Sequence, residues 1–260
     1  MPYLTSYGNH EVLYPGTSSY SGFGSATDSG GECSVPTATL FPLPAPASHT
    51  APYYAYAAGP VFVAMISSEH DITTGSAQNE WLNKTLAGVD REATPFLIVS
   101  SHRPMYINSD FSGVPTADVE VMQLLQKHLE PVTAAHRVTL MLYGHSHRAE
   151  RVSAAFAGKV VSASAAVPDA SGAGGVLHVY DRPRATVHYV AGTAGAAYSQ
   201  NDCVSGGWGP CPAWSEAVVY EHGYLRFTAL NATALRYDYV ASVNGSVIDS
   251  MVILQDLTAW

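Results

Sequence analysis

The stretch VTLMLYGHSH, residues 138–147, joins a short apolar and β-branched run to a glycine and two histidines. Its first five residues are typical of a buried strand, and the histidines follow where that strand ends. The same arrangement occurs twice more, where residues 96–100 precede the segment 101–104 (SHRP) and residues 2–7 precede the segment 8–11 (GNHE). Ligands of open α/β sheets bind at the carboxyl ends of strands. We therefore expect the three polar segments to meet at one edge of a sheet.

Apolar runs and amphipathic segments alternate around these sites. Strands are predicted at residues 61–66, 95–99 and 138–142, and helices at residues 76–88 and 116–132. This alternation favours parallel βαβ units with both faces of the sheet covered. The Ser-, Gly-, Pro- and Ala-rich residues 16–60 predict a surface excursion without regular structure.

The second half of the chain changes in character. Strand-like segments separated by turn residues predict a mostly antiparallel sheet packed against the first. These segments are residues 159–163, 176–180, 185–190, 217–220, 224–230, 235–240 and 247–253. The whole chain, residues 1–260, is therefore expected to form one α/β domain, of which residues 217–255 are the β-rich C-terminal portion.

The charge of the chain restricts its partners. The 260 residues include 21 acidic and 12 basic residues, for a formal net charge of −9, and contain no run of Lys or Arg. Binding to nucleic acid or to an anionic membrane is not expected of such a surface. No stretch approaches the roughly 20 apolar residues that span a bilayer. A small acidic substrate would need a local positive centre, which a metal ion can supply.

Other features point to a secreted parent protein. Asn83, Asn231 and Asn244 begin N-glycosylation sequons. Cys203 and Cys211 enclose a loop short enough for a disulfide, which leaves Cys33 without a partner. Residues 1–11 lack the charged and then apolar layout of a signal peptide, so none is expected in this chain.

The polar segments carry side chains that bind metals. His102, His145 and His147 offer imidazole nitrogens and Asn9 an amide oxygen, which suit a divalent ion. In an extended segment His145 and His147 would point to the same side, with their Cα atoms roughly 6–7 Å apart. Such a pair can serve two ions about 3.5–4 Å from each other.

These segments, in this order, are similar to motifs of a known family. Residues 8–11 resemble a GNH[ED] motif, residues 99–102 a VxxH motif and residues 144–147 a GHxH motif. The chain thus resembles the calcineurin-like metallophosphoesterases and, within them, the purple acid phosphatases. Weaker matches surround the motifs, at residues 68–71, 102–106, 150–151 and 220–226. The resemblance implies a four-layer α-β-β-α sandwich of two mixed sheets.

The resemblance also implies a reaction and roles for individual residues. Asn9, His102 and His145 would bind a divalent ion, and His147 would bind the ion that is ferric in purple acid phosphatases. The expected cofactor is a binuclear centre of Fe(III) with Zn, Mn or Fe(II). His10 would be the catalytic and substrate-binding histidine, which donates a hydrogen bond to phosphate or a proton to the leaving group. The implied activity is hydrolysis of small phosphate monoesters by a secreted, vacuolar or lysosomal enzyme, with a homodimeric parent left open.

The sequence also departs from the family. No Gly-Asp dipeptide occurs, so the GDxG and GDxxY motifs that complete the ferric site are absent. We therefore expect an N-terminally truncated domain with an incomplete first metal site. The substrate histidines that some plant members carry after the VxxH motif have no counterpart in residues 107–111, so His70 is a candidate for that role, with an ordinary loop histidine as the alternative.

Two other functions fit the same residues. One is a phosphodiesterase or nucleotide hydrolase, because the superfamily shares its metal motifs and differs in pocket walls. The other is a non-catalytic fragment that binds at most one metal ion. Glu150 and Arg151 are expected either to steady the histidine loop or to form a surface ion pair.

Overall fold

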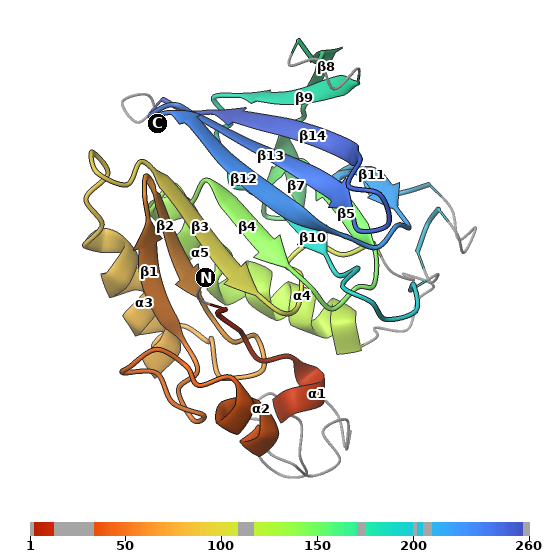
Figure 1. Ribbon diagram of the computed structural model, residues 1–260. Helices are drawn as coiled ribbons and strands as arrows, with labels where there is room; N and C mark the ends of the chain where they lie inside the picture. The colour runs from red at the N-terminus through yellow and green to blue at the C-terminus, as the bar shows by residue number, and fades with distance from the viewer. Residues whose placement is uncertain are drawn as a thin grey trace.

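A computed structural model describes residues 3–12, 34–108, 117–170, 175–199, 202–204 and 210–256 of this chain. Two large sheets pack face to face, and the longer helices lie on the outer side of one of them (Figure 1). The helices are α1 (Asn9–Val12), α2 (Val35–Leu40), α3 (Ala77–Ala87), α4 (Ala117–His128) and α5 (Glu130–Ala135).

The first sheet has seven strands and carries the predicted parallel core. Its strand order is β1 (Tyr54–Ala58), β2 (Val61–Met65), β3 (Phe96–Ser101), β4 (Leu140–Tyr143), β10 (Val187–Ala191), β5 (Ala149–Val152) and β11 (Ser215–Val219). Strands β2, β3, β4 and β10 run parallel to one another. The strands and the helix expected in residues 61–101 are thereby confirmed, including Ser76, whose hydroxyl accepts a hydrogen bond from Asn79 N at the start of α3.

The second sheet has five strands. Their order is β12 (Gly223–Asn231), β13 (Ala234–Ala241), β14 (Val247–Leu254), β9 (Val176–Asp181) and β8 (Ala165–Pro168), while β6 (Ala154–Phe156) and β7 (Lys159–Ser162) form a separate hairpin. All pairs in this sheet are antiparallel except β14 with β9. The expected strands of the second half are present, but they do not form one sheet, because β10 and β11 join the first.

Strand β3 shows why its sequence is apolar without interruption. Leu97 and Val99 contact the cluster under the helices, whereas Phe96 and Ile98 contact the cluster between the two sheets. Because successive side chains of a strand point to opposite faces, a strand buried on both sides needs apolar residues at every position. The two mixed sheets expected from the resemblance are confirmed. Among the described residues, the helices cover the first sheet only (Figure 1).

Three local predictions are wrong. Residues 3–8 form no strand and lead directly into α1. Residues 34–60 belong to the expected excursion, yet they contain α2 and also β1, which pairs with β2 through a tight turn at Gly59, where φ is 57°. The helix expected at residues 116–132 is two helices, because Pro131 has no N–H to donate to the preceding turn.

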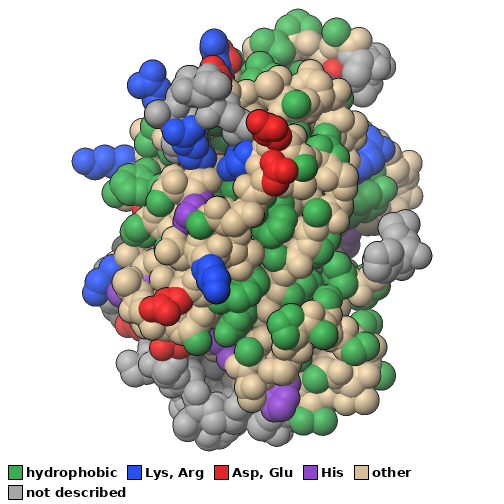
Figure 2. Space-filling view, turned by 90° about the vertical axis from the view of Figure 1, so that its left-hand side faces the viewer, with side chains coloured by type: hydrophobic (Ala, Val, Ile, Leu, Met, Phe, Trp, Pro, Cys, Tyr) green, Lys and Arg blue, Asp and Glu red, His purple; other side chains and the backbone are tan. Residues whose placement is uncertain are grey.

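The face that carries β1 and α3 shows hydrophobic side chains mixed with scattered acidic and basic ones (Figure 2). An open groove on this part of the chain is lined by Phe62, Trp81 and Val89, among others. None of the helices in the described residues is both long and apolar enough to cross a membrane.

Candidate metal centre

The predicted histidines lie at neighbouring strand ends. His102 follows β3, and His145 and His147 follow β4, the parallel neighbour of β3 in the sheet. The histidine loop, residues 144–148, is tightly turned and not extended as expected. Ser146 N donates to Gly144 O at 2.7 Å, and His145 has a φ of 62°. The left-handed conformation therefore falls on His145, where a side chain makes it costly, and not on Gly144.

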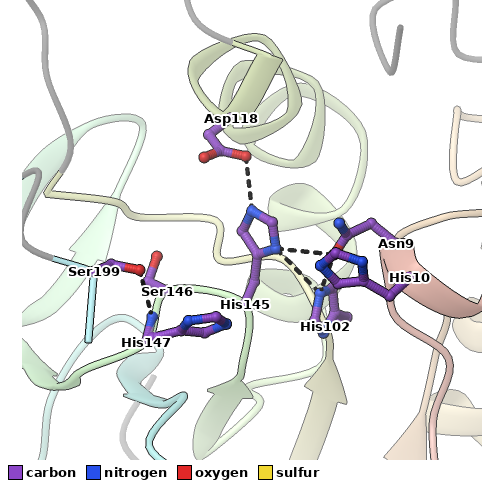
Figure 3. A pocket seen from close by; sticks show the side chains of 8 residues that line it. All are labelled: Asn9, His10, His102, Asp118, His145, Ser146, His147 and Ser199. Atoms are coloured by element: carbon purple, nitrogen blue, oxygen red, sulfur yellow. Dashed lines mark hydrogen bonds and ion pairs between the residues drawn. The ribbon is translucent and has the colours of Figure 1, made fainter. Parts of the chain in front are cut away.

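Three potential ligand atoms converge in this pocket (Figure 3). Asn9 Oδ1 lies 2.8 Å from His102 Nε2 and 3.2 Å from His145 Nδ1, and the two nitrogens lie 3.1 Å apart. Ligand atoms that share one zinc ion at about 2.1 Å are roughly 3.0–3.4 Å from one another. Two of the three distances lie in this range and the third, 2.8 Å, is about 0.2 Å shorter, so small shifts would let all three atoms bind a single divalent cation.

His147 lines the same pocket but is held by a different segment. Its Nδ1 lies 2.8 Å from the carbonyl of Ala197, and its backbone N–H donates to Ser199 Oγ at 3.1 Å. A carbonyl only accepts, so Nδ1 carries the hydrogen and Nε2 keeps a lone pair. Within the described residues, no three His, Cys, Asp or Glu side chains form a metal-binding group. The convergent set thus consists of two histidines and one asparagine.

The pocket has a volume of about 220 Å³. Its walls are formed by Asn9, His10, His102, Asp118, His145, Ser146, His147 and Ser199. His10 follows Asn9 in α1 and is exposed, so its imidazole is accessible to a ligand that enters. Asp118 is the single carboxylate among these described lining residues.

Gly8 brings the first segment against the second. A Cβ at Gly8 would lie 2.7 Å from His102 Cε1 and 2.9 Å from its Nε2, which is closer than two side chains approach. Glu11 closes the turn, because its carboxylate accepts a hydrogen bond of 2.8 Å from Gly8 N. The glycine of the first motif is therefore needed to seat the imidazole of His102.

The pocket keeps His102 neutral. Burial, together with the nearby charge of Arg103, lowers the pKa of His102 to about 3. A neutral imidazole is the form that binds a metal. Burial alone would raise the pKa of Asp118, but the hydrogen bonds from His145 and Arg103 and the charge of Arg103 leave that pKa below its ordinary value.

Comparison with known proteins identifies the family of this chain. Residues 1–149 match the family model of the calcineurin-like phosphoesterases, and residues 185–250 match that of the iron/zinc purple acid phosphatase-like protein C. The chain belongs to the purple acid phosphatase branch of the calcineurin-like phosphoesterases. The GNH[ED], VxxH and GHxH motifs of this family are the three segments that supply Asn9, His102 and His145.

Individual proteins match almost the whole chain. A protein of Arabidopsis thaliana named probable inactive purple acid phosphatase 24 is 32% identical over 98% of this chain and 38% of its own length. A nucleotide pyrophosphatase/phosphodiesterase of Hordeum vulgare is 29% identical over 98% of this chain and 63% of its own. The structure of a purple acid phosphatase from yellow lupin (Lupinus luteus) seeds superimposes with a TM-score of 0.80 at 29% identity, over 99% of this chain and 41% of the lupin chain. The chain thus spans only part of the length of these relatives.

A buried ionic cluster supports the histidine loop of this purple acid phosphatase domain. Arg148 is 1% exposed, donates to Glu150 at 3.0 Å and to the carbonyl of Asn108 at 2.7 Å, and lies 3.7 Å from Asp202. Glu150 also accepts from Ser215 Oγ at 2.7 Å. Glu150 therefore steadies the loop through Arg148.

The alternative of a surface ion pair between Glu150 and Arg151 is wrong. Both side chains are buried, and they have different partners. Arg151 makes ion pairs of 2.5 Å with Glu216 and 3.1 Å with Asp249, in the region between the sheets. Adjacent residues of strand β5 point to opposite faces, so the two side chains cannot act as one pair.

The remaining candidates lie elsewhere. His70 does not line the metal pocket, and its Nδ1 lies 2.8 Å from Ser67 Oγ. Cys203 and Cys211 form the expected disulfide, with Cα atoms 5.0 Å apart, while Cys33 is outside the described residues. The asparagines of the three sequons are exposed: Asn83, Asn231 and Asn244.

Neither Asp118, which lines the pocket, nor Arg103, which binds Asp118 from behind it, was predicted as a site residue. Asp118 lies in the first turn of α4, 2.8 Å from His145 Nε2 and 2.8 Å from Arg103 Nη1. Arg103 directly follows His102 in the sequence. The feature of the sequence that could have indicated Asp118 is its position as an acidic residue at the start of the helix that follows the segment 101–104.

Proposed function

We propose that Asn9, His102 and His145 hold one divalent cation, and that the pocket above them takes the phosphate group of an ester that the parent protein hydrolyses. The observation that carries this proposal is the convergence of their three ligand atoms within 3.2 Å of one another. A monoester is the first substrate to test, because the family includes acid phosphatases.

A divalent ion in this position would polarise a phosphoryl oxygen and help to generate a nucleophile from water at neutral pH. His10, exposed at the edge of the pocket, would donate a hydrogen bond to phosphate or a proton to the leaving oxygen. His147 would offer its Nε2 to a second, ferric ion. A second ion beside His147 would need further ligands. Asp118, the carboxylate that lines the described pocket, is not one of them, because it already pairs with Arg103 and His145.

The names of the relatives support two other functions. The Arabidopsis relative is called probable inactive, which favours a chain without turnover. The barley relative is called a nucleotide pyrophosphatase/phosphodiesterase, which favours a diester or pyrophosphate substrate. The substrate test must therefore include both kinds of ester.

The experiment uses the full chain with Zn²⁺, Mn²⁺ and Fe³⁺. Bound metal is measured by mass spectrometry after gel filtration, and hydrolysis is followed with p-nitrophenyl phosphate and bis(p-nitrophenyl) phosphate. His102→Ala should abolish metal binding, whereas His128→Ala should not, because His128 bonds to Thr74 outside the pocket. One bound ion without turnover would favour the inactive chain, and faster cleavage of the diester would favour the phosphodiesterase. Equal metal binding by both variants would refute the site.

We also propose that the parent protein is secreted or vacuolar and glycosylated. The exposure of Asn83, Asn231 and Asn244 and the disulfide of Cys203 with Cys211 support this proposal. Expression in a eukaryotic secretory host should give a product whose mass falls after treatment with an N-glycosidase. An unchanged mass would contradict it.

A further inference from the structure

We propose that Asp118 is a positioning residue, which holds the imidazole of His145 in the one tautomer and orientation that can bind a metal together with Asn9 and His102. This inference rests on the metal site proposed above. It assigns a role to a residue that lies outside all three sequence motifs.

The hydrogen bonds of His145 determine its tautomer. Its Nε2 lies 2.8 Å from Asp118 Oδ1, and an ionised carboxylate only accepts hydrogen bonds. Arg103 Nη1 lies farther from the same Nε2, at 3.3 Å, and donates to Asp118 Oδ1 at 2.8 Å, so the shorter contact with the carboxylate decides that Nε2 carries the hydrogen. A neutral imidazole has a single N–H, so Nδ1 keeps its lone pair, and that lone pair faces Asn9 Oδ1 and His102 Nε2.

Asp118 supports the metal site without joining it. Figure 3 shows its carboxylate on the far side of the His145 ring from Asn9 and His102. A cation between the three convergent atoms would therefore be separated from Asp118 by the imidazole ring. A carboxylate that accepts from the second nitrogen of a metal-binding histidine fixes the ring and makes it a stronger ligand.

Asp118 is in turn held in place by Arg103, which also forms a buried ion pair with Glu69. Arg103 Nη1 donates to the same Oδ1 at 2.8 Å, and its Nε donates to Glu69 Oε1 at 2.9 Å. The side chains of Arg103 and Glu69 are 6% and 0% exposed, whereas that of Asp118 is 32% exposed. Asp118 also lies in the first turn of the twelve-residue helix α4, where the helix dipole favours a negative charge. The carboxylate is thus positioned before any metal binds.

The first test reads the tautomer without a metal. In the full chain labelled with ¹⁵N-histidine, long-range ¹H–¹⁵N NMR spectra should show His145 as the Nε2–H form. Asp118→Ala should convert that signal to a mixture of tautomers. Glu120→Gln is the matched control, because Glu120 is an exposed carboxylate in the same turn of α4, and it should leave the signal unchanged.

The second test measures Zn²⁺ affinity by competition with a chromophoric chelator. Asp118→Ala should weaken binding about 10- to 100-fold. Asp118→Glu, which restores a carboxylate, should recover most of the loss, and Glu120→Gln should have no effect. The partial exposure of Asp118 makes these variants tolerable to the fold, which unfolding curves would check.

The two proposals fail in different ways. If Asp118→Ala keeps both the tautomer and the affinity of the parent chain while His102→Ala loses zinc, Asp118 has no positioning role and the metal site stands. If His102→Ala also binds zinc as the parent chain does, the metal site is wrong and the role of Asp118 falls with it.

Discussion

Gly8→Ala should displace a metal ligand while leaving the fold intact. The added Cβ would lie 2.7, 2.8 and 2.9 Å from His102 Cε1, Nδ1 and Nε2. Non-bonded carbon atoms pack at about 3.5–4.0 Å, so the ring must move by about 0.8 Å or more. Gly8 is not among the glycines with positive φ, so alanine fits its backbone conformation.

The size of this shift sets the expected loss of affinity. Metal–ligand distances tolerate only about 0.2 Å of error, so His102 Nε2 would leave the ligand position. Misplacing one histidine should weaken Zn²⁺ binding at least about tenfold. The free energy of unfolding should fall by about 1 kcal/mol, at the low end for overpacking, because the ring can move into the pocket.

Gly144→Ala provides the matched control. A Cβ at Gly144 would lie 3.6 Å from His102 Nδ1, which is an ordinary contact, so zinc affinity should change by less than about threefold. Chelator competition and urea unfolding of both variants give the two quantities. Equal zinc affinities for Gly8→Ala and the parent chain, or equal losses for the two glycine variants, would refute the steric argument.

Two further predictions concern buried charge. Arg148→Met removes the cation beside Glu150 and Asp202 and should lower the free energy of unfolding by about 3–5 kcal/mol. Arg182 lies in an exposed ion pair, so Arg182→Met should leave the free energy of unfolding nearly unchanged, and equal losses for the two variants in urea unfolding would contradict the prediction. Burial lowers the pKa of His188 from 6.5 to about 3. As the pH falls, His188 is therefore protonated in the unfolded chain before it is protonated in the folded chain. The free energy of unfolding that is present above pH 6.5 is consequently lost as the pH falls toward 3. The loss of unfolding free energy between pH 7 and pH 5 is about 2 kcal/mol. His188→Gln should remove this loss from the measured pH dependence of stability. An unchanged pH dependence would exclude His188 as its source.

The sequence determined the parallel core and the candidate ligands. Residues 61–65 and 96–101 are strands because their apolar runs suit burial on both faces, and that pattern is local. His102 and His145 could be placed at one edge of the sheet because parallel neighbours end together. The motif segments also identified Asn9, although residues 3–8 before it are not a strand.

The tertiary structure alone decided how distant segments combine. Strands β10 and β11 were expected in one sheet with β12 and β13, yet they join the other sheet, since the choice depends on which neighbour buries them. Asp118 lies 27 residues before His145 and contacts it only because helix α4 packs beside the end of β4. Local preferences determine where strands and helices form, whereas contacts between side chains far apart in the sequence arise only when those elements pack together.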